Sequence, residues 1–398
     1  MTRGITMDTG CNLSCEYCYE HPSREIRSPE YDVESIINSL DEWKNRWEND
    51  KAPGLHGGEP MLIPDDDMEL FFDYINSNWD DNPWIQTNGS LIQEHHIEMF
   101  KEYNVHVGIS CDGPGELNDK RIAKSDNTRE ITEKTISNIF KLREEGVGVG
   151  VIVVVHNHNA GTDEKLNKLL NWIVELNDVG ISGHYNPGRA PSSQLELTPK
   201  RYGEVLIQTW NLLKQSEEYS WNPVRRMQDA LLYGDNSSCT MGKCDPRGTE
   251  VAKCITGDGS FTGCARMWPQ LGDGNPFLQG PSNNDSYGSW NGRYDLLKQL
   301  PQDSGGCNGC EYWGVCYGGC PGNGKGTDYR KKTYWCESYK MLYDEIKSDM
   351  KKLFPNMNFK QENPNIGIFA DIKEQCTVGK VQKSNTKKNS FEWEGVNE

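Results

Sequence analysis

The sequence predicts an α/β fold built on a parallel sheet, followed by a smaller cysteine-rich module. Strand and helix patterns alternate over the first two-thirds of the chain, which is typical of strands joined by crossover helices. Residues 147–155 are apolar on both faces, as in a strand covered by helices. From Cys239 onward, cysteine and glycine dominate and the strand patterns become short. We therefore expect a first domain over residues 1–198, a bridging helical segment over 199–238, the cysteine-rich module over 239–355 and a tail over 356–398.

The elements of the first domain follow from hydrophobic periodicity. Strands are predicted at residues 5–7, 54–56, 83–87, 105–110, 147–155 and 179–184. Helices are predicted between them, near residues 31–47, 67–77, 93–103, 129–145 and 164–176. The helix at 31–47 has the clearest pattern, because Val33, Ile36, Ile37, Leu40, Trp43 and Trp47 recur at helical spacing.

Two further helices are predicted outside the first domain. The pattern at 199–217 should connect the two parts of the chain, with its apolar face formed by Val205, Leu206, Trp210 and Leu213. The pattern at 336–353 should close the cysteine-rich module, with its apolar face formed by Tyr339, Leu342, Tyr343, Ile346 and Met350. The tail is rich in Lys, Ser, Asn and Glu, so we expect disorder there.

Composition excludes several classes of protein. The net charge of −17, from 42 basic and 59 acidic residues, argues against nucleic-acid binding, which needs a basic surface. No segment approaches the ~20 apolar residues that a membrane helix requires, and no apolar signal segment is evident. The 14 cysteines occur in a chain of 398 residues, far longer than a small disulfide scaffold. We therefore expect a cytoplasmic protein.

Three cysteines near the start of the chain form the most specific motif. Cys11, Cys15 and Cys18 have the spacing C-x3-C-x2-C and follow a short apolar strand. A structural zinc site uses four protein ligands, whereas an iron–sulfur cube held by three cysteines leaves one iron open to a small molecule. A disulfide pair with a spare thiol, or a zinc loop with a distant ligand, are the alternatives.

This spacing, with Tyr17 just before the third cysteine, resembles the radical S-adenosylmethionine (SAM) superfamily. The resemblance implies a partial (β/α)6 barrel whose 4Fe-4S cluster binds SAM through its open iron. It also implies that an electron passed into the sulfonium yields a 5′-deoxyadenosyl radical, which takes hydrogen from an unactivated carbon.

Three motifs at predicted strand ends extend the resemblance. They are Gly57-Gly58-Glu59-Pro60, Gln86-Thr87-Asn88-Gly89 and Ser110-Cys111-Asp112-Gly113-Pro114. The resemblance implies that SAM is contacted by Tyr17, Gly57, Gly58, Glu59, Gln86, Thr87, Asn88, Ser110, Asp112 and Arg121. Alternate side chains of a strand share a face, so we expect Ser110 and Asp112 at the barrel mouth and Cys111 in the core. Arg121 could reach the SAM carboxylate or equally form a surface salt bridge.

The cysteines of the second module resemble the SPASM domain, an extension of radical SAM enzymes that modify peptides and proteins. Their core is Cys307-x2-Cys310-x5-Cys316-x3-Cys320, followed by Cys336. The resemblance implies two auxiliary 4Fe-4S clusters, an inner one on Cys239, Cys244, Cys264 and Cys320 and an outer one on Cys307, Cys310, Cys316 and Cys336. Cys254 could replace Cys239, and Cys376 is expected to be unliganded. A zinc ribbon is the alternative for any C-x2-C pair.

The resemblance therefore implies a peptide or protein maturase that installs an oxidative change such as a thioether or carbon–carbon cross-link. It also implies a flavodoxin- or ferredoxin-type reductant. Because ten residues precede Cys11, we expect a separate leader-recognition protein or direct binding of the peptide. The loops at His156 and His184 should face substrate, and His184, Tyr185 and Arg266 are candidates for positioning it or relaying protons.

Three alternatives to this function remain open. Anaerobic sulfatase-maturating enzymes share these motifs, but in them an aspartate follows the cysteine that corresponds to Cys264, where this chain has Ala265. An electron-transfer iron–sulfur protein would have no use for an open iron. A small-molecule substrate is the third alternative.

Overall fold

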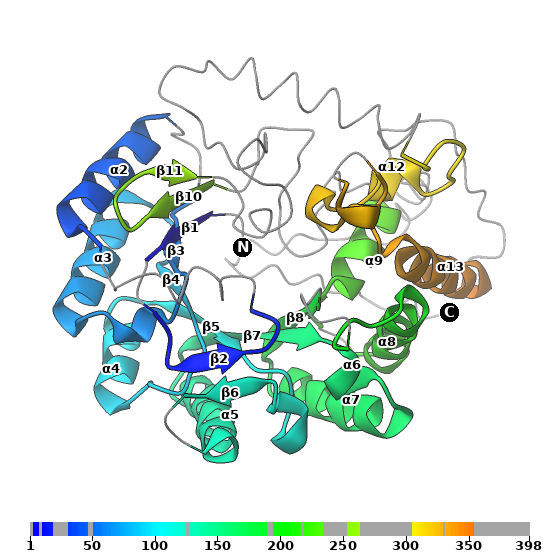
Figure 1. Cartoon of the computed structure of the whole chain (residues 1–398), viewed down its shortest axis with the longest axis horizontal. Coiled ribbons are helices and arrows are strands. Elements are labelled where there is room, and N and C mark those ends of the chain that lie inside the picture. Colours follow the sequence, from blue (N-terminus) through cyan, green and yellow to red (C-terminus); the bar gives the residue numbers. More distant parts are fainter. Residues whose placement is uncertain are drawn as a thin grey trace, which may run out of the picture.

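The computed structural model describes residues 3–7, 10–18, 31–46, 51–124, 127–188, 194–216, 219–233, 253–262, 305–328 and 331–353. Its first part repeats a strand followed by a helix, with the strands in a parallel sheet and the helices outside it (Figure 1). The strands are β1 (Arg3–Thr6), β3 (Gly54–His56), β4 (Trp84–Thr87), β5 (His106–Ser110), β7 (Gly148–Val155) and β8 (Ser182–Pro187). The helices that follow them are α2 (Val33–Arg46), α3 (Asp65–Asn78), α4 (Glu94–Glu102), α5 (Thr128–Glu144), α7 (Asp163–Asp178) and α8 (Pro199–Leu213). The predicted α/β class with a parallel sheet is confirmed.

One predicted strand is displaced along the chain. The periodicity predicts a strand at 179–184, but α7 continues to Asp178 and Val179 is its C-terminal cap. Gly180 then adopts a positive φ of 74°, which turns the chain before β8 can begin at Ser182. The helix therefore takes the first residues of the predicted strand.

The sheet contains strands that the periodicity did not indicate. Its order is β11-β10-β1-β3-β4-β5-β7-β8-β9, where β9 is Trp221–Asn222, β10 is Lys253–Thr256 and β11 is Phe261–Thr262. β10 lies parallel to β1, with Gly4 opposite Cys254. The hairpin of β10 and β11 falls in the range predicted as the cysteine-rich module, yet it extends the first sheet.

The turn of this hairpin is packed against the start of α2. Gly259 has a φ of +81°, and a Cβ there would stand 2.7 Å from the carbonyl oxygen of Ser35. The Ser39 hydroxyl donates to the Gly259 carbonyl at 2.5 Å, and the Asp32 amide donates to the Gly257 carbonyl at 2.8 Å. Both the conformation and the close approach require glycine at position 259.

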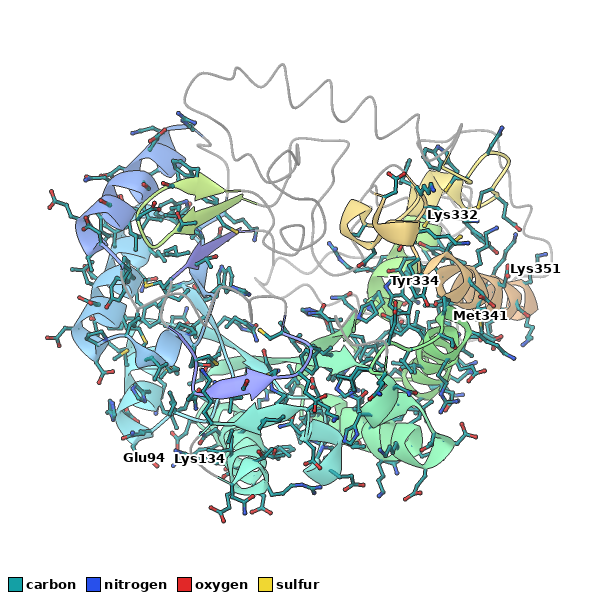
Figure 2. All side chains as sticks on the ribbon, viewed as in Figure 1. Glu94, Lys134, Lys332, Tyr334, Met341 and Lys351 are labelled. Atoms are coloured by element: carbon teal, nitrogen blue, oxygen red, sulfur yellow. The ribbon has the colours of Figure 1, made fainter. Side chains whose placement is uncertain are left out.

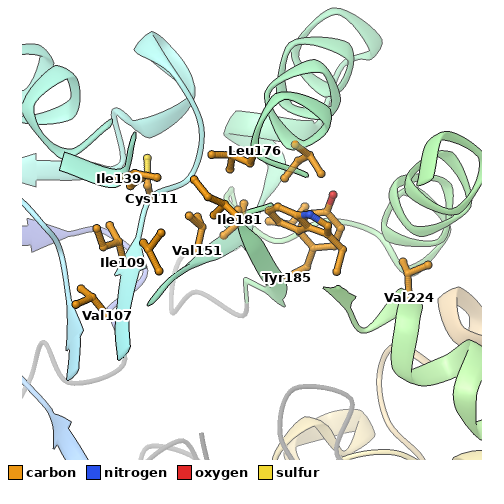
Figure 3. Close-up of a cluster of buried hydrophobic side chains, with 14 of the residues drawn as sticks. Val107, Ile109, Cys111, Ile139, Val151, Leu176, Ile181, Tyr185 and Val224 are labelled. Atoms are coloured by element: carbon orange, nitrogen blue, oxygen red, sulfur yellow. The ribbon is translucent and has the colours of Figure 1, made fainter. Parts of the chain in front are cut away.

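The core lies between the sheet and the helices (Figure 3). Cys111 is fully buried there, with Ile109, Ile139 and Val151 in the same cluster. The prediction that Cys111 is a core residue is confirmed. The first part of the chain also contains three short elements, which are η1 (Pro60–Leu62), η2 (Gly115–Asn118) and α6 (Asn157–Ala160).

The bridging and closing helices pack against each other. α8 begins after the Thr198 side chain, which accepts from the Arg201 amide, and the predicted apolar face of α8 is buried. α13 (Cys336–Leu353) has the predicted bounds, and its Asp349 accepts hydrogen bonds from Trp210 at 2.9 Å and Lys214 at 2.7 Å. Gly203 of α8 faces α13, because a Cβ there would lie 2.5 Å from the Met341 sulfur.

The remaining elements are α9 (Val224–Tyr233), α12 (Trp313–Cys316), η5 (Pro321–Asn323) and η6 (Lys325–Thr327). Figure 2 labels Lys332, Tyr334, Met341 and Lys351, which lie in and beside α13. Within the described ranges, none of the helices is both long and apolar enough to cross a membrane. The predicted tail, 356–398, lies outside the described residues.

Candidate active site

The three-cysteine loop forms a small two-stranded sheet with the segment that follows β5. β2 (Leu13–Cys15) pairs antiparallel with β6 (Arg121–Ala123), which places Cys15 opposite Arg121. Backbone hydrogen bonds continue this pairing beyond both strands, from Glu16 to Lys120 at 3.0 Å and from Lys124 to Asn12 at 3.1 Å. The loop is therefore fixed to the segment that follows β5.

The sulfur atoms of this loop act on one another. Burial raises the pKa of Cys15 to about 11, Arg121 opposes this rise, and Cys18 and Cys11 add to it. Neighbouring thiolates repel each other, so three of them are stable together only beside positive charge. An iron–sulfur core supplies that charge, so the three residues fit the cluster that their spacing predicts.

A buried network of polar side chains contacts the three-cysteine loop. The Tyr17 hydroxyl donates to Asp112 Oδ2 and accepts a hydrogen bond from Arg121 Nη1 at 2.9 Å. Asp112 is fully buried, and its Oδ1 accepts from the Val154 amide at 2.9 Å. Burial raises the pKa of Tyr17 well above its usual value, and Arg121 opposes that shift. Tyr17 therefore remains a neutral hydrogen-bond donor.

This network changes two of the sequence interpretations. Arg121 is 8% exposed, so the alternative of a surface salt bridge is wrong. Ser110 is half-buried and accepts from Gln86 Nε2 at 2.9 Å, whereas both Asp112 oxygens accept from protein donors. Asp112 thus has a supporting role that its motif did not predict, and the SAM contacts themselves stay predictions.

Glu59 joins the ends of β3 and β4. Its Oε1 accepts from the Met61 amide at 3.0 Å and the Thr87 hydroxyl at 2.5 Å, and its Oε2 accepts from the Asn88 amide at 2.8 Å. Burial raises the pKa of Glu59, and these three hydrogen bonds oppose the rise. The Glu59 amide also donates to the Gly10 carbonyl at 2.7 Å. One carboxylate therefore holds two motifs together beside the cysteine loop.

The motif before Glu59 needs its glycines. Gly57 has a φ of +91°, and a Cβ there would stand 2.5 Å from the Thr6 methyl carbon. Gly58 also has a positive φ, of 29°. The two glycines let the chain pass close to β1.

Several residues of the network lie outside the recognised motifs. Asn12 donates to Ser90 Oγ at 2.9 Å and accepts from Asn88 Nδ2 at 2.8 Å, which links the cysteine loop to the end of β4. Asn118 accepts from the Asp112 amide at 2.8 Å, and Asn159 donates to the Asp112 carbonyl at 3.0 Å. These contacts span up to 78 residues of sequence, so periodicity and spacing give no sign of them.

His156 also belongs to this network. It is fully buried, its ring centroid lies 5.3 Å from that of Tyr17, and its Nε2 lies 3.4 Å from Asp112 Oδ2. Its Nδ1 accepts from the Asn159 amide at 3.3 Å, so the ring caps α6. The expectation of an open substrate-facing loop is therefore corrected for His156, whose side chain packs beneath the cysteine loop.

A second set of cysteines surrounds one cavity. Cys307, Cys310, Cys316 and Cys336 line it together with Trp313, Tyr339 and Tyr343. Burial raises the pKa of Cys316, and Cys336, Cys307 and Cys310 raise it further, so the four sulfurs lie near one another. This donor set fits the predicted outer cluster. The assignment of Cys320 to the inner cluster stays a prediction.

Comparison with known proteins agrees with the geometry. Residues 5–173 match the family model of the Radical SAM superfamily. The chain contains a radical SAM domain. It is homologous to anaerobic sulfatase-maturating enzymes. The chain is 25% identical over 378 residues to the cysteine-type enzyme of Clostridium novyi (strain NT), and the aligned region covers 89% of this chain and 96% of that relative.

Solved structures share the fold of this chain. Native anSMEcpe with bound AdoMet and Cp18Cys peptide has a TM-score of 0.66 at 20% identity, covering 89% of this chain and 98% of that one. Streptococcus suis SuiB bound to precursor peptide SuiA has a TM-score of 0.56 at 15% identity, covering 84% and 76%. A radical SAM domain implies a 4Fe-4S cluster and SAM. The assignment of Cys11, Cys15 and Cys18 to that cluster stays a prediction.

The three predicted catalytic candidates have different outcomes. Tyr185 is fully buried and its hydroxyl lies 2.9 Å from Thr209 Oγ1 of α8, so its assignment to the substrate side is wrong (Figure 3). His184, the preceding residue of β8, is half-buried and lies on the opposite face of the strand. Arg266 lies outside the described residues, as do Cys239, Cys244 and Cys264. Cys254 is half-buried on β10.

Proposed function

We propose that this protein is a radical SAM maturase that modifies a peptide or protein by hydrogen abstraction followed by oxidation. The observation that carries the proposal is the second cysteine set, in which Cys307, Cys310, Cys316 and Cys336 line one cavity in addition to the loop at Cys11. Such a set provides a fully ligated cluster, which suits electron transfer rather than SAM binding. The proposal includes an inner cluster completed by Cys239 or Cys254.

The bound cluster and SAM supply a 5′-deoxyadenosyl radical that removes a hydrogen atom from substrate carbon. The remaining substrate radical must then lose one electron and, as a new bond forms, one proton. A cluster held by Cys307, Cys310, Cys316 and Cys336 would take up this electron, so the substrate would lose two hydrogens overall. Tyr17 and Asp112 join the cysteine loop to the strand ends, and the Glu59 amide donates to the Gly10 carbonyl just before that loop.

A peptide substrate is supported by two structural neighbours, anSMEcpe and SuiB, whose structures hold the Cp18Cys peptide and the precursor peptide SuiA. The predicted partners are a precursor peptide, a separate leader-recognition protein and a flavodoxin- or ferredoxin-type reductant. A thioether or carbon–carbon cross-link is the proposed product, because both need a net two-electron oxidation.

Sulfatase maturation is the second candidate. Homology to a cysteine-type enzyme over 89% of the chain favours it. Ala265 counts against it, because this position lacks the carboxylate that the resemblance leads us to expect. The two candidates differ in substrate rather than in the first chemical step.

Anaerobic co-expression with two kinds of peptide separates them. The short peptides encoded beside the gene and a sulfatase-derived peptide are each analysed by intact mass and fragmentation, with a Cys15→Ala variant as the inactive control. Loss of two hydrogens from a neighbouring peptide, absent with the variant, is the expected result. Formylglycine in the sulfatase peptide alone would replace the first candidate by the second. No SAM cleavage in the reduced, reconstituted protein would instead favour an electron-transfer protein.

A further inference from the structure

Two lysines share the cavity of the outer cysteine set. Lys332 and Lys340 line it with Cys307, Cys310, Cys316 and Cys336. The Lys332 side chain lies along Gly306, because its Cδ and Cε atoms stand 3.5 Å, and its Nζ atom 3.7 Å, from the point where a Gly306 Cβ would be. Its amide donates to the Gly305 carbonyl at 3.0 Å, which holds it beside Cys307.

Lys340 reaches the cysteines from the closing helix. It follows Cys336 by four residues on α13, so both side chains occupy the same helix face. The Lys340 side chain also hydrogen-bonds the Cys310 side chain, and both residues line the cavity. Cys336 is the first residue of an 18-residue helix, whose N-terminus carries partial positive charge.

Nearby acids offset this charge only in part. Glu311 accepts from Lys347 Nζ at 2.5 Å, and Asp344 accepts from the Tyr312 hydroxyl. Glu337, the neighbour of Cys336 on α13, is exposed. Lys332 and Lys340 therefore bring two positive charges to the cysteine set, in a chain whose net charge is −17.

We propose that Lys332 and Lys340 raise the reduction potential of the outer auxiliary cluster, so that it accepts the electron released by the substrate. The inference rests on the proposed function, because it requires a cluster on the four cysteines. Four thiolates carry more negative charge than an iron–sulfur core offsets, and reduction adds one further negative charge. Cations beside the sulfurs stabilise the reduced form, and net charge and hydrogen bonds to sulfur are established determinants of cluster potential.

The electron balance is complete within the proposed reaction. The hydrogen atom removed from carbon is carried away by 5′-deoxyadenosine. The substrate radical then loses one electron, which the outer cluster takes directly or through the inner one, and one proton, which leaves to solvent. The redox partner afterwards reoxidises the cluster.

Lys332→Met and Lys340→Met test the proposal. Each variant is reconstituted as the full chain in a Cys15→Ala background, which removes the signal of the SAM-binding cluster. Anaerobic redox titrations followed by electron paramagnetic resonance then give the midpoint potentials. We expect each substitution to lower the reduced-to-oxidised ratio at a fixed potential about tenfold, equivalent to a shift of about 59 mV to more negative potential. Lys340→Arg, which keeps the charge, should keep the midpoint potential close to that of the chain with Lys340.

Lys352→Met is the matched control. Lys352 lies on the same helix, is 70% exposed in its side chain and pairs with Asp349 at 2.9 Å. Its charge is paired and lies more than a Debye length along α13 from Lys340, so the midpoint should not move.

Three outcomes decide the matter. Unchanged potentials with full iron content would overturn the role of the lysines while leaving the cluster intact. Loss of iron from the lysine variants would also overturn it, since the lysines would then serve assembly rather than potential. Cys310→Ala tests the cluster separately: unchanged iron content and spectrum in that variant would defeat the proposed function itself.

Discussion

The Tyr17 hydroxyl donates a hydrogen bond to Asp112 Oδ2, across 95 residues of sequence. This contact ties the loop that carries Cys11, Cys15 and Cys18 to the residues that follow β5. The same carboxylate accepts from the Val154 amide on β7, so two strand ends converge on the loop. Positioning of the cysteines therefore depends on a side chain that the cysteine spacing does not include.

Tyr17→Phe should weaken both the fold and the cysteine loop. The substitution removes the donor to a fully buried carboxylate, and an unsatisfied buried group costs about 1–3 kcal/mol, more if charged. We expect a lower free energy of unfolding in denaturant titrations and less iron after reconstitution. Tyr31→Phe is the control, since Tyr31 donates to Asp67 at a partly exposed site and should matter less. Equal effects of the two variants would contradict this account.

Glu59→Gln should be destabilising although it removes a buried charge. The carboxylate accepts from three donors through its two oxygens. The glutamine amide has a single oxygen, and its NH2 group cannot accept a hydrogen bond. One donor is left unsatisfied, which should lower the free energy of unfolding by about 1–3 kcal/mol. Thermal and denaturant unfolding measure this, and a variant as stable as the parent would show that the hydrogen bonds do not matter.

Cys15→Ala and Cys310→Ala should separate the two cysteine sets. Replacing Cys15 should abolish release of 5′-deoxyadenosine from SAM, because two thiolates cannot hold the cluster. Replacing Cys310, which lines the other cavity, should spare much of that release while lowering product. Chromatography of both products under reducing, anaerobic conditions provides the measurement. Equal loss of both activities in Cys310→Ala would indicate a folding defect instead.

His96 should make the fold sensitive to acid. Its Nδ1 accepts from the Gln93 amide at 3.0 Å, and burial lowers its pKa from the usual 6.5, with His95 lowering it further. Protons therefore bind the unfolded chain more readily, so stability is complete above pH 6.5 and falls as the pH drops toward the folded-state value. His96→Asn keeps an acceptor for the amide but does not titrate. Denaturant titrations between about pH 5 and 7 should show a shallower pH dependence for this variant, and parallel curves would refute the assignment.

Gly259→Ala should loosen the hairpin of β10 and β11. The residue has a φ of +81° and lies against Ser35, so a methyl group meets both strain and a clash. Gly146→Ala is a close control, because its φ is also +81° but nothing lies within 4 Å of the added carbon. The excess loss of unfolding free energy in Gly259→Ala measures the packing against α2. If the two variants lose equal stability, that packing contributes nothing.

Elements with a repeated pattern could be predicted from the sequence. The helix at 336–353 and the strand at 54–56 have the expected bounds, because apolar spacing and flanking turns define them locally. The strand expected at 179–184 begins only at Ser182, because helix and strand patterns overlap in this segment and Gly180 turns the chain between α7 and β8. β10 has only four residues and pairs with a strand about 250 positions earlier, so no local signal indicates it.

The candidate site was predictable only where its residues stand in motifs. Cysteine spacing and the glycine-rich strand ends indicate the chemistry. The spacing does not reveal that Asp112 supports Tyr17, or that His156 packs below them, because these contacts join three distant parts of the chain. Tyr185 was misassigned because adjacent strand residues face opposite sides, and its ring points to the helices.

The pairing of β1 with both β3 and β10 has a consequence for synthesis on the ribosome. β3 ends at His56, but the other neighbour of β1 ends only at Thr256, 256 − 56 = 200 residues later. At about 5–20 residues per second, translation of that interval lasts roughly 10–40 s. Throughout this time the first strand has an uncovered edge, which can template pairing with another nascent chain. A chaperone that occupies this edge until residue 256 emerges would protect the nascent protein from aggregation.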